Sequence, residues 1–153
     1  RAGLFRLSIS GLITSMQHLP LGRRKIYRVA LVAADATTNG LTHDATLLVI
    51  PAGALIHEVI ADTTEAWAGT AGTLFLRVGT STGGKDLVDE HDVETATLTK
   101  GGIIAPNGHL PSFSGTTTIS ARIRSSSGNV ATGGVSNLTT GATTFYIMIE
   151  ALQ

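Results

Sequence analysis

The stretch Gly79-Thr80-Ser81-Thr82-Gly83 matches G-x-S-x-G, the spacing that exposes a nucleophilic serine in many hydrolases. In those enzymes the serine lies on a sharp turn between a strand and a helix, and a histidine held by a carboxylate activates it. No helical pattern follows this stretch, and its composition is that of a flexible Gly/Thr turn. The sequence therefore favours a turn over a catalytic site, and we expect no enzyme activity.

The same loop nearly matches a phosphate-binding P-loop, because Gly79 and Gly84-Lys85 have the required spacing. Asp86, however, occupies the position of the Ser or Thr that coordinates magnesium, and its charge would repel a phosphate. A P-loop also needs a following helix whose amino terminus attracts the anion. We therefore predict no nucleotide site.

Five of the eleven acidic residues lie close to His91, between Asp86 and Glu94. Carboxylates close in sequence can converge on calcium, but these lack the D-x-D-x-D-G order of an EF-hand. A solvated charged loop is the first interpretation, an acidic contact surface the second and a metal site the third. We predict neither a metal ion nor another cofactor.

The five histidines are far apart, and none shows the H-x-x-x-H or H-E-x-x-H spacing of metal ligands. His57 alternates with apolar residues, which predicts a hydrogen-bonded or interface-facing imidazole. Trp67 follows an apolar strand pattern and is expected to anchor the core or an interface rather than to stack on a sugar. Asn137-Leu138-Thr139 has the form of a glycosylation sequon, which has meaning only in a secreted eukaryotic protein.

The composition limits the protein classes that remain. A chain of 153 residues has the size of one domain, and the absence of cysteine excludes disulfides and thiolate metal sites. Eighteen glycines, 42% hydrophobic and 14% charged residues indicate a globular chain of short strands and small-residue turns. No apolar run approaches the roughly 20 residues that cross a bilayer, so we expect a soluble protein without a membrane partner. A formal net charge of zero argues against a general nucleic-acid binder.

The most strongly patterned stretch runs from Ala45 to Trp67. The apolar run Leu47–Ile50, the turn residues Pro51-Ala52-Gly53 and the alternating residues Leu55–Ile60 predict a hairpin of two strands and a tight turn. Residues 86–95 are expected to form a short helical turn or an exposed loop. Further strands are predicted over residues 25–34, 73–78, 116–125 and 143–151, and a hairpin over residues 96–105.

About seven or eight strands, with no helix long enough for a βαβ crossover, exclude a parallel sheet. The predicted fold class is all-β, an antiparallel β-sandwich or jelly roll in a single domain over residues 25–153, preceded by an extended N-terminal arm over residues 1–24. The strand over residues 25–34 is apolar on both faces apart from Arg28. Such a strand needs a second cover, which predicts a homo-oligomer.

Residues 1–21 contain scattered apolar side chains without a sustained period, which indicates an arm lying on another protein surface. An edge strand with ragged ends fits the same pattern equally well. Residues 1–25 carry five cationic side chains and no acid, so the charges are expected to orient a protein contact. The predicted protein-interface residues are Phe5, Arg6, Ile9, Arg23, Arg24, Lys25, Tyr27 and Arg28.

The stretch Leu47–Trp67, with its I-P-A-G-A turn, its L-I-H-E-V-I strand and its acidic exit Asp62–Trp67, resembles a segment of small virion proteins of tailed bacteriophages. The following T-L-F-L-R-V-G-T-S segment and the strand F-Y-I-M-I-E continue the resemblance, which covers roughly Ala45 to Ala151. It consists of small and β-branched residues rather than of a catalytic signature.

In that group the fold is a β-sandwich or jelly roll, and the common role is that of a capsid decoration (cement) protein, often a trimer. The resemblance thus implies a structural virion protein on the outer surface of a phage head. Its partners would be the major capsid protein and copies of itself in a homotrimer. Tail- and fibre-associated proteins are similar, so a structural or carbohydrate-binding β-sandwich of the tail or fibre is the alternative.

Overall fold

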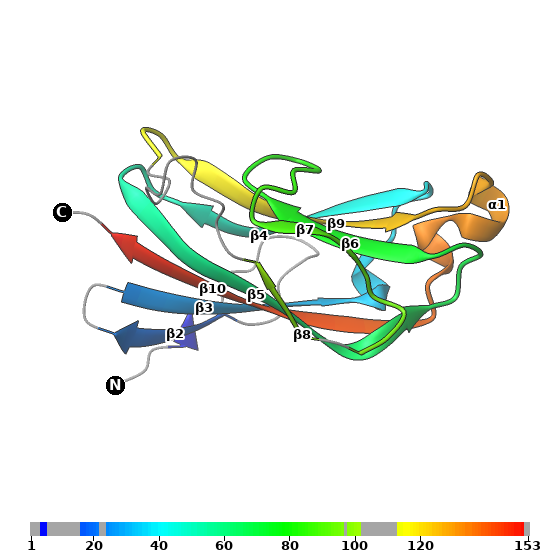
Figure 1. Ribbon diagram of the computed structural model, residues 1–153, viewed down its shortest axis with the longest axis horizontal. Coiled ribbons are helices and arrows are strands. Elements are labelled where there is room, and N and C mark those ends of the chain that lie inside the picture. The colour runs from blue at the N-terminus through cyan, green and yellow to red at the C-terminus, as the bar shows by residue number, and fades with distance from the viewer. Residues whose placement is uncertain (1–3, 6–15, 22–23, 97, 102–112, 152–153) are drawn as a thin grey trace.

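The structure is a computed structural model that describes residues 4–5, 16–21, 24–96, 98–101 and 113–151 of the chain. Two antiparallel sheets pack face to face (Figure 1), which confirms the predicted all-β sandwich. Across sheet A the strands are β1 (Leu4–Phe5), β2 (Met16–Leu21), β3 (Arg24–Val32), β10 (Thr140–Ala151), β5 (Ala54–Ala68) and β8 (Leu98–Gly101). Across sheet B they are β4 (Thr42–Ile50), β9 (Thr117–Ser125), β6 (Leu74–Gly79) and β7 (Val88–Asp92).

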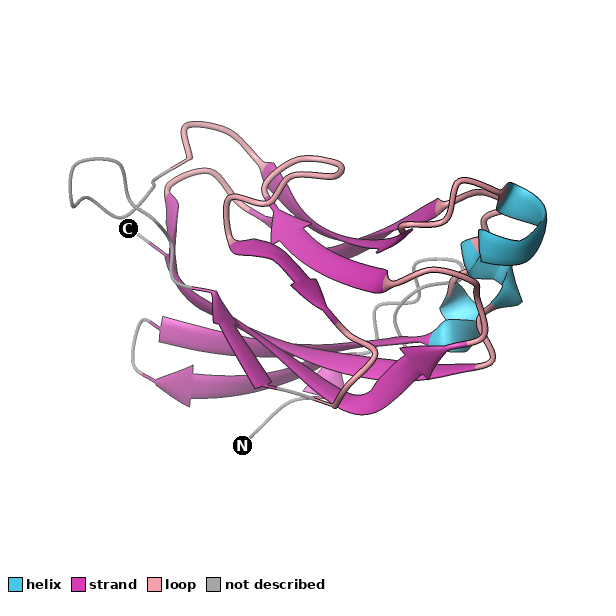
Figure 2. Ribbon diagram, turned by 45° about the vertical axis from the view of Figure 1, so that its right-hand side comes forward, coloured by secondary structure: helices cyan, strands magenta, loops and turns pink. Residues whose placement is uncertain are grey.

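Three short helical segments complete the described fold: η1 (Ala33–Asp35), α1 (Val130–Gly133) and η3 (Val135–Asn137). They gather at one end of the sandwich (Figure 2). The last two lie in the polar stretch before β10, where Asn129 caps α1 by accepting a hydrogen bond from the backbone of Ala131. Within the described residues no helix has the length and apolarity needed to cross a membrane.

The core lies between the two sheets because each strand turns every second side chain inward. From sheet A, β3 contributes Val29 and Leu31, while β10 contributes Phe145 and Ile147, all nearly without solvent exposure. Burying a large apolar side chain stabilises a fold by about 1.5 to 3 kcal/mol, so these alternating positions supply most of the driving force. Sheet B contributes Ala45, Leu47, Ile50, Leu74, Leu76, Val78, Ile119, Ala121 and Ile123.

Trp67 lies in this core, as expected for an anchor, with 1% of its surface exposed. Its indole Nε1 donates a hydrogen bond to Oγ1 of Thr143 at 2.9 Å, and that hydroxyl also contacts Oγ1 of Thr63 at 3.1 Å. The backbone of Gly141 lies directly against the indole ring, since a Cβ at this position would be 2.3 Å from Cδ2 of Trp67. The tryptophan thus joins β5 to β10 and is not available to stack on a ligand.

The prediction of a hairpin around Pro51 was wrong. Both strands exist, but β4 pairs with β9 in sheet B, whereas β5 pairs with β10 and β8 in sheet A. The backbone N–H of Ala54 donates to the carbonyl of Pro51 at 3.3 Å, and Gly53 has a φ of +77°, as in a type II turn. Such a turn lacks the twist of a two-residue hairpin, so it leads the chain from one sheet to the other.

Residues 86–95 were expected to form a helical turn or a loop, but they contain strand β7, which pairs with β6. The strand forms because Val88 and Val93 are buried in the core, while its charged residues face outward. A hairpin was expected over residues 96–105. Its first half contains β8, which pairs with β5, whereas residues 102–105 lie outside the described part of the chain. These additional short strands raise the described number to ten.

The described part of the predicted N-terminal arm belongs to sheet A. Strand β2 pairs antiparallel with β3, and β1 pairs with β2 (Figure 1). The sequence pattern allowed either an arm lying on another protein surface or a strand at the edge of a sheet. The described residues lie at the edge of sheet A. The remaining residues of the segment, 1–3, 6–15 and 22–23, lie outside the described residues.

Candidate functional site

The outer face of sheet A carries apolar side chains that the core does not use. On β3 these are Ile26, Ala30 and Val32, of which Val32 is 39% exposed. Across the strands Ile26 is paired with Met148, and both remain half-buried. Partly exposed apolar side chains on neighbouring strands are typical of a surface that contacts another protein.

A polar cluster lies on the same face, at one end of β10. Glu150 accepts from His57 Nε2 at 2.7 Å and from Arg24 Nε at 3.4 Å. His57 occupies a bulge of β5, because Glu58 and Ile56 are opposite consecutive residues of β10. The hydrogen bond with His57, followed by the contacts with Arg24, lowers the pKa of Glu150. The expectation of a hydrogen-bonded imidazole at His57 is therefore confirmed.

The predicted interface residues do not all lie on this face. Arg24 and Arg28 are exposed on it, whereas Tyr27 lies on the opposite side of β3, packed against the core. Burial raises the pKa of the Tyr27 hydroxyl. Lys25 is half-buried on the same side as Tyr27. Of the others, Phe5 lies in β1, and Arg6, Ile9 and Arg23 lie outside the described residues.

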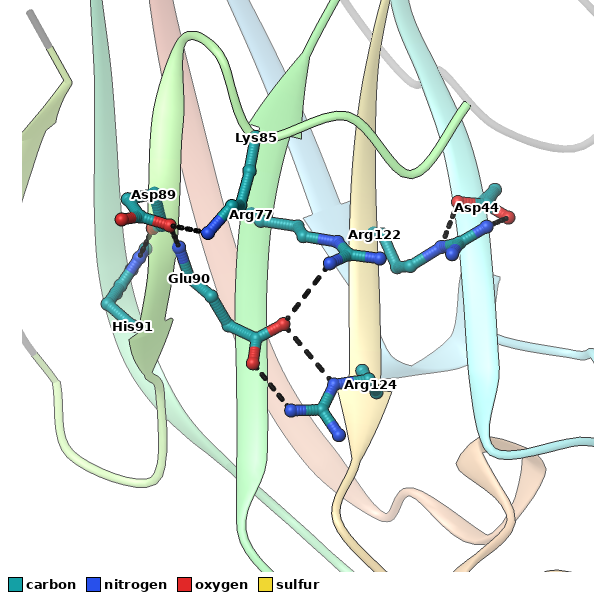
Figure 3. Close-up of polar contacts among 8 residues, drawn as sticks. All are labelled: Asp44, Arg77, Lys85, Asp89, Glu90, His91, Arg122 and Arg124. Carbon is teal, nitrogen blue, oxygen red and sulfur yellow. Dashed lines mark hydrogen bonds and ion pairs between the residues drawn. The ribbon is translucent and has the colours of Figure 1, made fainter. Parts of the chain in front are cut away.

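The outer face of sheet B carries a cluster of charged side chains (Figure 3). Arg122 on β9 donates two hydrogen bonds to Asp44 on β4, each of 2.7 Å. Arg124 binds Glu90 of β7 in the same bidentate manner and lies 5.1 Å from the ring centroid of Phe75. The hydrogen bonds from Arg124 hold the pKa of Glu90 below its usual value.

Arg77 on β6 is less well satisfied than its two neighbours. It lies directly opposite Arg122, and its Nη1 is 3.5 Å from Glu90 Oε2, an oxygen that already accepts from Arg124. Its Nε is buried without a hydrogen-bond partner among the described residues. Three guanidinium groups therefore share two carboxylates, and Arg77 is the one that lacks a bidentate carboxylate.

This charged surface was missed at the level of sequence because residues 86–94 were interpreted as a solvated loop. A signal for it was present in the sequence. On one strand Phe75 and Arg77 alternate with buried aliphatic residues, and on another Arg122 and Arg124 do the same. Each arginine occupies an outward position next to buried aliphatic residues. Outward arginines on neighbouring antiparallel strands must face one another, and the acids of the following segment are the nearest counter-charges.

The loop with the serine and phosphate-loop motifs joins the antiparallel strands β6 and β7. Ser81 is exposed in it, and no helix follows, so the strand-to-helix turn of a nucleophile elbow is not formed here. Asp86 accepts hydrogen bonds from the backbone N–H and the hydroxyl of Thr80, at 3.0 and 2.7 Å, and thereby closes the loop. Lys85 forms an ion pair with Asp89 at 3.2 Å. Among the described residues no group of three or more acids and histidines is placed to hold a metal ion.

No protein-family model matches the chain, and no curated protein matches it significantly. Among solved structures, the fold is similar to a chain of the cyanophage Pam1 capsid asymmetric unit, with a TM-score of 0.58 and 15% identity. That match covers 97% of this chain and 94% of the other. The fold is also similar to a chain of the acid-stable capsid of Helicobacter pylori bacteriophage KHP30, with a TM-score of 0.53 and 13% identity. This second match covers 83% of this chain and 86% of the other. At these identities the likeness shows the fold, and it extends over nearly the whole of the chain in the first case.

Proposed function

We propose that this protein is a structural protein of a phage particle, a capsid decoration protein that binds the outer surface of the head. The observation that carries the proposal is the match, over most of both chains, to small sandwich chains from two phage capsids. The resemblance of Ala45–Ala151 to small virion proteins points to the same role. A tail- or fibre-associated role is the second candidate, and the capsid origin of both similar structures favours the head.

The use of the polar side chains agrees with a structural role. Asp44 and Glu90 hold arginines on the outer face of sheet B, and Asp86 closes a loop. These three acids are thus bound to neighbouring side chains or backbone groups, which agrees with a structural role.

The outer face of sheet A is the surface that we assign to the shell. It combines the half-buried Ile26 and Met148 with the exposed cations Arg24 and Arg28. Exposed ion pairs contribute only about 0 to 1 kcal/mol each, so the apolar contacts would supply retention and the charges orientation. Strand β2 extends the sheet beyond β3 next to this surface.

Each copy of a decoration protein can bind the shell only weakly through contacts of this kind, and the attachment becomes tight when several copies are linked. We propose a homotrimer, in which docking of one copy places the others at high effective concentration over the shell. The major capsid protein is the proposed partner. The outer surface of the virion is the proposed location.

The proposal is tested by adding the full chain to phage particles assembled without it and measuring co-sedimentation with the heads. We expect saturable binding, and we expect Arg28→Glu to weaken it because a cation of the docking face is replaced by an acid. Lys85→Glu, the same charge change on the sheet B side, serves as the matched control and should bind like the wild type. Binding to isolated tails but not to heads would contradict the assignment.

A further inference from the structure

We propose that the copies of this protein contact one another through the β6–β7 side of sheet B, where Arg77 of one copy binds the carboxylates of Asp92 and Glu94 of the next. This inference rests on the proposed homo-oligomer and names the surface that forms it. It assigns sheet B to contacts between copies, on the opposite side of the sandwich from the face assigned to the shell.

The first part of this contact is the incomplete pairing of Arg77. The side chain is 21% exposed and lies among charged groups on the outer face, with its guanidinium beside Arg122 (Figure 3). Glu90 is already bound in bidentate fashion by Arg124, so it serves Arg77 only as a distant ion pair. A partly desolvated guanidinium that lacks a bidentate carboxylate gains more from an incoming carboxylate than a solvated one, because the surrounding dielectric is lower.

The arginine side chains on either side of Arg77 are held in place by their own partners. Arg122 is fixed by Asp44, and its guanidinium lies under the loop at Gly83, where a Cβ would be 2.4 Å from its Cζ. Arg124 is fixed by Glu90 and by its contact with Phe75. A partner group therefore meets a preorganised site, and little side-chain entropy is lost on binding.

The second part of the contact is a pair of exposed carboxylates at the end of β7. Asp92 and Glu94 flank Val93, whose side chain is fully buried, so both acids point away from the core. The backbone N–H of Glu94 donates to Asp92 Oδ1 at 2.8 Å, which holds the two residues together. In the described chain neither acid forms an ion pair with a cation.

The chemistry of the site suits a carboxylate. A guanidinium group binds the two oxygens of a carboxylate in bidentate fashion, as Arg122 binds Asp44 and Arg124 binds Glu90 on this face. The acidic end of β7 in a second copy supplies such carboxylates. The contact would also cover β7, which is an edge strand of sheet B in the described part of the chain.

The location of the two parts is suited to a closed assembly. Arg77 lies on the strand next to β7, and the acids lie at the end of β7, so both belong to one side of sheet B. Because the two patches are neighbours on one surface, the contact can close in either of two ways. It can form reciprocally between two copies about a two-fold axis, or head to tail in a ring.

A charge swap tests the pairing, with the mass of the full-length protein in solution followed by sedimentation equilibrium. Arg77→Glu and Glu94→Arg should each raise the concentration at which the oligomer dissociates by about tenfold or more, and the double variant should return it to within about threefold of the wild type. Arg77→Gln removes the charge without placing an acid beside Glu90, and it should weaken the oligomer in a protein that remains folded by circular dichroism. Glu65→Arg, the same charge change as in Glu94→Arg but at an exposed acid of β5 in sheet A, is the matched control and should leave the oligomer unchanged.

Each other outcome overturns the inference. A wild type that stays monomeric, or single variants whose defects are not relieved in the double variant, removes the contact between copies. An Arg77 variant with an unchanged oligomer but weaker binding to heads would assign Arg77 to the shell instead. Binding to heads is measured separately by co-sedimentation, so failure of the contact and failure of the decoration role are distinguished.

Discussion

At the scale of single residues, the packing of Gly141 against Trp67 leaves no room for a side chain at this position. Gly141 has a φ of +138°, and a Cβ there would meet the indole at 2.3 Å. We predict that Gly141→Ala lowers the free energy of unfolding by about 2 to 4 kcal/mol, the sum of backbone strain and overpacking. Urea denaturation measures this change.

Gly128→Ala is the matched control, because nothing lies within 4 Å of a Cβ at that position. Its stability should stay within about 0.5 kcal/mol of the wild type. Equal effects of the two substitutions would mean that the tryptophan does not pack against β10 in solution.

His43 on β4 should make stability depend on pH near neutrality. Burial lowers the pKa of His43, an effect that the charges of Asp44 and Asp35 oppose only in part. The unfolded chain takes up the proton at about pH 6.5, whereas the folded chain does so only at lower pH. The free energy of unfolding should therefore fall as the pH drops below about 6.5, until the folded pKa is reached.

Thermal unfolding between pH 7.5 and 5, compared with that of His43→Gln, measures this contribution. The variant should show a smaller loss of stability over this range, because it lacks the imidazole whose protonation favours the unfolded chain. The other four histidines are the same in both proteins, so the difference reports on His43. The carboxyl groups of Glu90 and Glu150, whose pKa values are lowered by their partners, titrate below this window. An identical pH dependence in both proteins would show that His43 is solvated.

At the scale of elements, alternation within one strand was predictable from the sequence, but the pairing of strands was not. The strands over Leu47–Ile50 and Leu55–Ile60 were correctly predicted because their inward residues are strictly apolar. Their assignment to different sheets depends on β9 and β10, which come more than 50 residues later in the chain. Local periodicity contains no information about partners so distant.

Strand β7 shows a second limit of sequence reasoning. Its acids resembled a solvated loop, because the arginines that neutralise Glu90 lie on β6 and β9. Likewise, the irregular segment Met16–Leu21 could be placed at a sheet edge only when β3 was present to pair with it. In both cases a tertiary partner determines the secondary structure, which is why the surface around Arg77 was missed and the edge of sheet A was left undecided.

At the scale of the whole molecule, the two outer faces have different characters. That of sheet A is mixed apolar and basic near β3, and that of sheet B carries a fixed charged cluster. The composition predicted the sandwich itself, since small β-branched strands without a crossover helix have few other ways to bury a core. Which face meets which partner depends on exposed side chains of several strands together, and so required the structure.

The central claim is that this chain is bound on the outer surface of a phage head. Electron cryomicroscopy of the particle that contains it tests this claim most directly. We predict density for a two-sheet sandwich, fitted by this fold, on the outside of the shell, with the outer face of sheet A toward the major capsid protein. Density for the chain on the tail or a fibre, or inside the shell, would contradict the account.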